Sequence, residues 1–103
     1  MKNVKLGVSL LLAFGIISAM NPAFAGEIRN RVVRQEGRID KGINSGKLTI
    51  PQAAQLQKAD ARINNQRLQD LKANDGKLTK SEYVQLNKEL NHVSNKINSD
   101  EKN

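Results

Sequence analysis

The chain contains no cysteine and no tryptophan, and only one tyrosine, two phenylalanines and one histidine occur among its 103 residues. Without cysteine it can form neither a disulfide nor the lipid anchor of a lipoprotein, and it has no thiol nucleophile. A small domain without disulfides must be held together by helix packing, by a partner or by self-association. The scarcity of aromatic side chains disfavours nucleic acid as a partner, because single strands are bound by stacking their bases on aromatic rings.

The side chains that catalysis requires are also few. His92 is the only histidine, and it lies on the polar flank of a predicted helix, where we expect it to face solvent. Single carboxylates are scattered along the chain and do not form a general acid–base pair. Neither a Gly-x-Ser-x-Gly turn nor a glycine-rich phosphate loop occurs in the sequence. The sequence therefore predicts a protein that is not an enzyme and that uses neither a cofactor nor a small-molecule substrate.

Residues 1–25 have the layout of a secretory signal peptide. Lys2 and Lys5 form a basic start, residues 6–19 form an apolar run, and Ala23-Phe24-Ala25 fits the A-x-A cleavage pattern. The apolar run is short for a membrane span, which needs about 20 residues. We therefore expect cleavage after Ala25, and a mature protein that is periplasmic or secreted.

Positive charge is concentrated at the start of the predicted mature chain. Without Lys2 and Lys5, 15 lysines and arginines oppose 10 aspartates and glutamates, so the net charge is +5. A basic face suits anionic lipid headgroups, lipopolysaccharide or an acidic protein surface, while the alternative is a helix face that only meets water. The residues predicted to contact a partner are Arg29, Arg31, Arg34 and Arg38, with Lys41 beyond them.

An internal repeat sets the architecture of the mature chain. Residues 44–49, Asn-Ser-Gly-Lys-Leu-Thr, are echoed thirty residues later by residues 74–79, Asn-Asp-Gly-Lys-Leu-Thr. Each copy combines a glycine turn, a leucine that we expect to pack beneath the turn, and a Thr-x-x-Gln/Glu capping box that starts a helix. The turn glycines are Gly46 and Gly76, and the predicted capping residues are Thr49, Gln52, Thr79 and Glu82.

Apolar residues at helical spacing predict one helix before, one between and one after these turns. We expect the helices over residues 27–42, over residues 50–73 and after Thr79, followed by a flexible polar tail over residues 99–103. Asn64-Asn65 is a point where the second helix could kink. The predicted buried faces are Ile28, Val32, Val33, Ile39 and Ile43 in the first helix, Ala53, Leu56, Ala59, Ile63, Leu68 and Leu71 in the second, and Tyr83, Leu86, Leu90, Val93 and Ile97 in the third.

Short turns favour antiparallel neighbours, so the predicted fold is all-α: a small antiparallel three-helix bundle over residues 26–98. The helices also carry many asparagines, which we interpret as polar helix faces rather than as a binding ladder. These asparagines are Asn64, Asn65, Asn87, Asn91, Asn95 and Asn98.

Residues 75–82 resemble the second half of an EF-hand calcium loop. With Gly76 at the sixth loop position, Asp75 takes the fifth and Glu82 the twelfth, as in EF-hands. The first and third ligand positions fall on Leu71 and Ala73, which cannot bind a cation. The resemblance thus implies similar turn-to-helix geometry, and it leaves Asp75 and Glu82 as weak candidates for holding a calcium ion.

Two further resemblances concern exported proteins. Residues 48–52, Leu-Thr-Ile-Pro-Gln, fit the LTxxQ motif of the periplasmic Spy and CpxP proteins, and residues 78–82 match it with Glu for Gln. This resemblance implies an all-helical envelope-stress chaperone. Residues 38–49 are similar to the repeated R-I-x-x-G-x-x-x-G-x-L-T-x-x-[EQ] unit of small proteobacterial secreted proteins of unknown function, with residues 74–82 as a truncated second unit. That similarity implies no assigned activity.

The sequence thus favours an exported, non-enzymatic helical protein that acts by contact, either as a chaperone-like protein for a client or on an anionic envelope surface. Two alternatives stay open at this point. One is a weak calcium binder of degenerate EF-hand type, and the other is a periplasmic inhibitor or immunity-type protein for one partner. A second copy of the same chain is also among the partners that the sequence allows.

Overall fold

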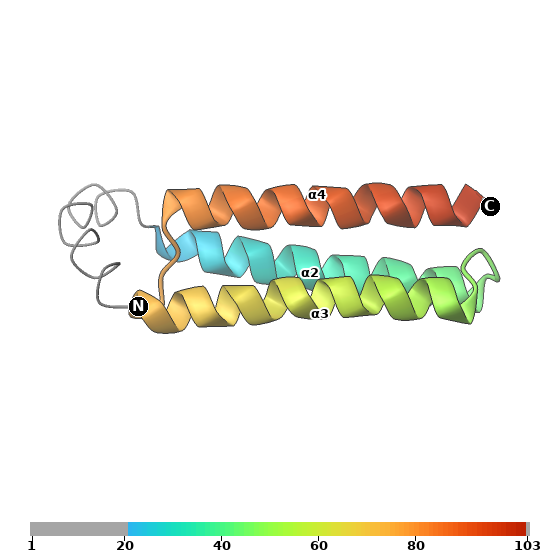
Figure 1. The fold of residues 1–103 in the computed structure, drawn as a ribbon, viewed down its shortest axis with the longest axis horizontal. Helices are drawn as coiled ribbons and strands as arrows, with labels where there is room; N and C mark the ends of the chain where they lie inside the picture. The colour runs from blue at the N-terminus through green and yellow to red at the C-terminus, as the bar shows by residue number, and fades with distance from the viewer. Residues whose placement is uncertain (1–20, 103) are drawn as a thin grey trace, which may run out of the picture.

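A computed structural model describes residues 21–102 of the chain, and these residues form three helices: α2 (Pro22–Asn44), α3 (Ile50–Ala73) and α4 (Lys80–Lys102). Each helix packs against both of the others along its length (Figure 1). Successive helices run in opposite directions, so α2 and α4 are parallel to one another. Within the described range there is no strand beyond a single bridge between Asn21 and Leu78. The predicted all-α three-helix bundle is therefore confirmed.

Each helix buries a seam in which spacings of three and four residues alternate. This seam is the pattern by which helices pack with knobs of one in holes of the next. The buried positions are Ile28, Val32, Gln35, Ile39 and Gly42 in α2, Ala53, Leu56, Asp60, Ile63 and Arg67 in α3, and Leu86, Leu90, Val93, Ile97 and Asp100 in α4. Polar and charged residues therefore occupy positions in the core itself.

Two predicted core residues lie on the surface instead. Val33 is 56% exposed and Leu68 is 49% exposed. The residue before each of them is buried in the seam: Val32 in α2 and Arg67 in α3. The alternating spacing fixes which side of a helix faces its neighbours, so the adjacent apolar residue is turned outward even though it is the more hydrophobic one in α3.

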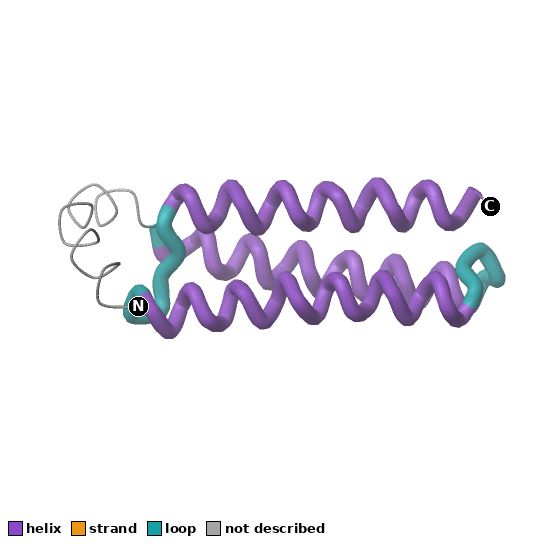
Figure 2. The backbone as a smooth tube through the Cα atoms, viewed as in Figure 1, coloured by secondary structure: helices purple, strands orange, loops and turns teal. Residues whose placement is uncertain are grey.

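The two repeated turns lie at opposite ends of the bundle, where Figure 2 shows them as loops. Gly46 and Gly76 have φ angles of +78° and +85°, which glycine adopts without strain. The leucine that follows each turn is buried beneath it, with Leu48 4% exposed and Leu78 fully buried. Both copies of the repeat therefore share the positive-φ glycine and the buried leucine, while only the second has a further positive φ, of 55° at Asp75.

Both capping boxes are formed. The backbone N–H of Gln52 donates to Thr49 Oγ1 at 3.2 Å, and the Thr49 N–H donates to Gln52 Oε1 at 2.9 Å. In the second copy the Glu82 N–H donates to Thr79 Oγ1 at 3.0 Å, and the Thr79 N–H donates to Glu82 Oε1 at 2.9 Å. These bonds satisfy backbone N–H groups that have no partner within the first turn of a helix.

Helix α2 begins at Pro22 rather than at residue 27, so the predicted start was wrong. Asn21 is the N-cap, and its Oδ1 accepts a hydrogen bond of 2.9 Å from the Ala23 N–H. The Phe24 ring stacks on Tyr83 of α4 with the ring centroids 4.1 Å apart. The last residues of the predicted signal peptide thus pack on the bundle, while its residues 1–20 lie outside the described part of the chain.

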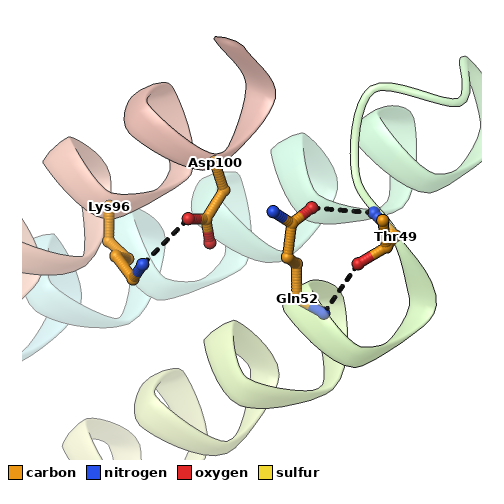
Figure 3. A network of polar contacts seen from close by, with 4 residues as sticks. All are labelled: Thr49, Gln52, Lys96 and Asp100. Carbon is orange, nitrogen blue, oxygen red and sulfur yellow. Dashed lines mark hydrogen bonds and ion pairs between the residues drawn. The ribbon is translucent and has the colours of Figure 1, made fainter. Parts of the chain in front are cut away.

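Helix α4 continues to Lys102, so the flexible tail predicted from residue 99 is helical as far as the structure describes it. Asp100 is 4% exposed and pairs with Lys96 at 2.9 Å. Figure 3 shows its carboxylate turned toward Lys96 of the same helix. Burial of Asp100 therefore holds the last turn of α4 on the bundle.

Helix α3 is continuous through Asn64 and Asn65, where the sequence allowed a kink. Asn64 Oδ1 accepts hydrogen bonds of 3.0 and 2.9 Å from the Nε and Nη2 atoms of Arg67. Because this amide bonds to a side chain one turn along the same helix, it does not compete for the backbone groups.

Candidate functional site

A strongly charged groove lies between α2 and α4. Its lining carries four cations and no carboxylate: Arg31, Arg34, Gln35, Gly37, Arg38, Lys41 and Ser94. We call it the basic groove. Three of the four predicted contact residues therefore come together here, and Lys41 joins them. The groove has a volume of about 490 Å³, which is within the range of ligand-binding sites.

Arg29, the fourth predicted contact residue, does not line the groove. The pKa of Arg67 in α3 is lowered first by its own burial and then by the positive charge of Arg29. The separation follows from helix geometry, because residues at spacings of three and four share one side of a helix, whereas residue 29 precedes Arg31 by only two. The structure thus brings Arg31, Arg34 and Arg38 together in one groove and leaves Arg29 outside it, and contact of all four with a partner stays a prediction.

Arg31 and Arg38 are held in place by α4. Arg31 donates from Nη1 to Asn87 Oδ1 at 2.8 Å and from Nη2 to Asn91 Oδ1 at 3.0 Å. Arg38 donates from Nη1 to Ser94 Oγ at 2.7 Å and from Nη2 to Asn98 Oδ1 at 2.8 Å. In both cases the partners lie 56 and 60 residues further along the chain. Each arginine therefore bonds to two side chains on α4, and the second set of bonds lies seven residues beyond the first on both helices.

The asparagines of α4 thus have a role that the sequence interpretation missed. Asn87, Asn91 and Asn98 were assigned to a polar helix face, but each accepts a hydrogen bond from an α2 arginine. The signal was present in the spacing, since residues 31 and 38, 87 and 94, and 91 and 98 are all seven residues apart. It could be recognised only once the two helices were known to be parallel and in register.

We call the hydrogen bonds from Arg31 and Arg38 to α4 the arginine ladder. Their acceptors are neutral asparagine and serine side chains, so the arginine charges are not compensated by contact. Within residues 21–102 the only ion pair within 4.0 Å joins Lys96 to Asp100, away from the basic groove. Arg34 and Lys41 are exposed, and Arg31 and Arg38 are half-buried. Uncompensated guanidinium groups with free N–H donors are suited to carboxylate, sulfate or phosphate groups. The groove therefore presents positive charge and N–H donors that are chemically suited to an anionic group.

The floor of the basic groove is a buried amide. Gln35 is 3% exposed, and its Nε2 donates to the backbone carbonyl of Leu90 in α4 at 2.7 Å. Its Oε1 has no donor among the described residues. This hydrogen bond sets Gln35 of α2 opposite Leu90 of α4 and so helps to fix the register of the two helices. It also makes the floor of the groove polar.

Beneath this floor α3 contributes a buried carboxyl group, Asp60. It has no exposed surface, and neither carboxylate oxygen has a donor in the described range. Burial, helped by the charge of Glu36 and opposed in part by that of Arg38, raises the pKa of Asp60 to about 6. Glu36 and Arg38 of α2 therefore lie within electrostatic range of Asp60. Asp60 has no solvent contact, so it belongs to the support of the groove and not to its surface.

The calcium candidates are engaged differently. Glu82 uses its carboxylate in the capping box and also accepts bonds of 2.9 and 3.2 Å from Asn74 Nδ2, while Asp75 is exposed in the turn. Glu82 does share a groove between α3 and α4 with Asp70 and Glu89, and the charges of Glu82 and Glu89 help to raise the pKa of Asp70 after its burial. Within the described residues, no group of three or more His, Cys, Asp or Glu side chains has the arrangement to hold a metal ion.

His92 is exposed, as predicted, on the rim of a second groove between α3 and α4. Its neighbours in that lining include Arg62, Lys88 and Glu89. The structure gives this imidazole no hydrogen bond to a carboxylate or hydroxyl group within residues 21–102, so no nucleophile–base pair is formed around it.

A scan of protein families, a search of curated proteins and a search of solved structures each find no match for this chain. None of the helices in the described range is long and apolar enough to cross a membrane.

Proposed function

We propose that this protein is an exported, non-enzymatic binding protein that contacts an anionic partner through the basic groove. The observation that carries the proposal is the arginine ladder. Arg31 and Arg38 are positioned by neutral asparagine and serine acceptors, so their charges remain available, and Arg34 and Lys41 stand between and beside them. A structural role alone would be served as well by arginines paired with carboxylates.

The proposal is tested by measuring retention of the protein on a carboxylated dextran surface and on an uncharged one. We expect retention on the anionic surface only, and we expect it to fall by at least about tenfold between about 50 and 200 mM salt as counterions compete for the cations.

A pair of matched variants connects this retention to the groove. Arg34→Gln combined with Lys41→Gln removes two exposed cations from the groove lining, and Lys58→Gln combined with Arg62→Gln removes two exposed cations from α3. Both variants lose the same net charge. We expect only the first to lose retention. Equal losses would show that overall charge, and not the groove, is responsible, and retention on neither surface would reject the proposed function.

A further inference from the structure

The four cations of the basic groove lie along one side of α2 and form two pairs with the same spacing. Arg31 and Arg34 form the first pair, and Arg38 and Lys41 form the second, each member displaced by seven residues from its counterpart. Seven residues of α-helix correspond to about 10 Å, and the whole row from Arg31 to Lys41 spans about 15 Å. The neutral acceptors on α4 are displaced by the same seven residues. The groove thus presents one cationic unit twice, at a fixed interval.

Each unit by itself is a weak anion site. The guanidinium of Arg31 already donates two of its five N–H groups to α4, and that of Arg38 likewise bonds to Ser94 and Asn98. The bonded N–H groups are directed at α4, so fewer donors of each pair are left for a phosphate or sulfate. Two weak sites in series favour a ligand that reaches both, because the second contact is made at a high effective concentration once the first has formed.

The lining of the groove also selects against other anionic partners. It contains no leucine, isoleucine, valine or aromatic residue, and the exposed large apolar residues Val33, Ile50, Leu68 and Val84 all lie outside it. A protein partner usually anchors an interface with large apolar or aromatic side chains. A membrane surface is held by an apolar helix face that enters the headgroup region. A hydrophilic chain requires neither feature.

We propose that the basic groove binds a linear polyanion, a flexible hydrophilic chain whose phosphate, sulfate or carboxylate groups recur along its length. This inference rests on the function proposed above and specifies the partner's class. One anionic group meets the Arg31–Arg34 pair and another meets the Arg38–Lys41 pair, while the chain between them lies along the groove over Gly37.

The test is calorimetric titration of the full chain with two series of soluble polyanions, polyphosphates and heparin fragments, each from a single unit to a long chain, and with inorganic phosphate. We expect affinity to rise by at least about tenfold between fragments that cover one cation pair and fragments that cover both. We expect little binding of inorganic phosphate. Preference for one series over the other identifies whether phosphate or sulfate is the better group, and either preference supports the proposal.

The variants Arg34→Gln/Lys41→Gln and Lys58→Gln/Arg62→Gln again serve as test and control. Arg34 and Lys41 hold no helix–helix hydrogen bond within residues 21–102, so their replacement leaves the ladder intact. We expect the groove variant to bind long chains about tenfold more weakly and with a salt slope smaller by about two, and the control variant to bind as the unmodified protein does.

Four results would overturn the inference. An affinity that does not depend on chain length would show independent single-anion contacts. Binding to phosphatidylglycerol vesicles without binding to any soluble polyanion would assign the groove to a lipid surface, which leaves the proposed function standing. Formation of dimers or larger species that long polyanions do not dissociate, seen by sedimentation, would assign it to a second copy of the chain. The absence of binding to every anionic probe would reject the proposed function as well.

Discussion

Asp60 is an ionisable residue without any exposed surface. Its carboxyl group lies in the core seam of α3 with no exposed surface and without a donor in the described range. An ionised carboxylate in such a place is destabilising, and the group responds by binding a proton more tightly. Its pKa of about 6 in the folded protein compares with 3.8 in the unfolded chain.

This shift predicts that the protein is more stable at mildly acidic pH. Well below the unfolded-state pKa of 3.8 the carboxyl group is protonated in both states and contributes no pH dependence. As the pH rises from about 4 to about 6, the unfolded chain releases the proton first, so the free energy of unfolding falls, by about 3 kcal/mol in total. Asp60→Asn should remove this fall, leaving stability nearly unchanged at pH 4 and raised by up to about 3 kcal/mol at pH 8.

The measurement is urea unfolding followed by circular dichroism at pH values from 4 to 8. Asp40→Asn on the exposed side of α2 is the control, and we expect it to change the free energy of unfolding by less than about 0.5 kcal/mol at every pH. If Asp60→Asn destabilised the protein equally at pH 4 and pH 8, the buried carboxyl group would not be the source of the pH dependence.

At the scale of a single element, the end of α2 explains why a glycine is present inside a helix. A Cβ atom at Gly42 would lie 2.5 Å from Leu48 Cδ1 and 2.7 Å from Leu48 Cγ, whereas a Cβ atom at Gly37 would meet no atom within 4 Å. The same turn folds back through hydrogen bonds from the Lys47 and Leu48 N–H groups to the Gly42 carbonyl, at 2.9 and 3.0 Å. Gly42 is therefore the surface on which the buried leucine of the repeat packs.

The two glycines of α2 should consequently respond in opposite ways to the same substitution. Gly37→Ala should raise the free energy of unfolding by about 0.5–1 kcal/mol, because alanine loses less backbone entropy on folding. Gly42→Ala should lower it by about 1–3 kcal/mol, because Leu48 must move out of a packed site. Thermal unfolding of both variants checks this pair. A stabilising effect of Gly42→Ala would show that Leu48 has room to shift.

At the scale of the whole molecule, the beginning of the described chain closes one end of the bundle. Asn21 caps α2 and bridges to Leu78, and Phe24 stacks on Tyr83, which in turn donates a hydrogen bond of 2.7 Å to Glu27. These contacts connect α2 with α4 and with the second turn. They lie at the end of the bundle opposite to the Gly46 turn (Figure 1).

A chain that starts at Gly26, as the predicted cleavage would leave it, should therefore be less stable than one that starts at Asn21. We expect a loss of about 2 kcal/mol, about half from the lost cap and half from the lost aromatic pair. Urea unfolding of the two chains measures the difference. In the longer chain, Phe24→Leu keeps the cap and should show only about half of the loss. Equal stability of the two chains would mean that residues 21–25 contribute nothing to the bundle.

Sequence patterns predicted the helices and turns of this molecule better than they predicted which side of each helix is buried. The helix count, both turns, both caps and most core positions followed from glycine, the Thr-x-x-Gln/Glu motif and apolar spacing. Val33 and Leu68 were assigned to the core because hydrophobicity was counted residue by residue, whereas Gln35, Asp60 and Arg67 fill the gaps in a seam that the apolar residues define only in part. The last turn of α4 was missed because its anchor is a charged residue, Asp100.

By itself the sequence determined where α3 and α4 start and where the chain turns, because a cap or a positive φ angle acts within four residues. The tertiary structure alone decided what the cations of α2 can do. Arg29 lies outside the basic groove, and Arg31 and Arg38 are joined to partners 56 and 60 residues away, on a helix whose parallel register is fixed by packing. Whether a row of arginines is neutralised, buried or left available depends on such distant neighbours, and here they leave its charge available.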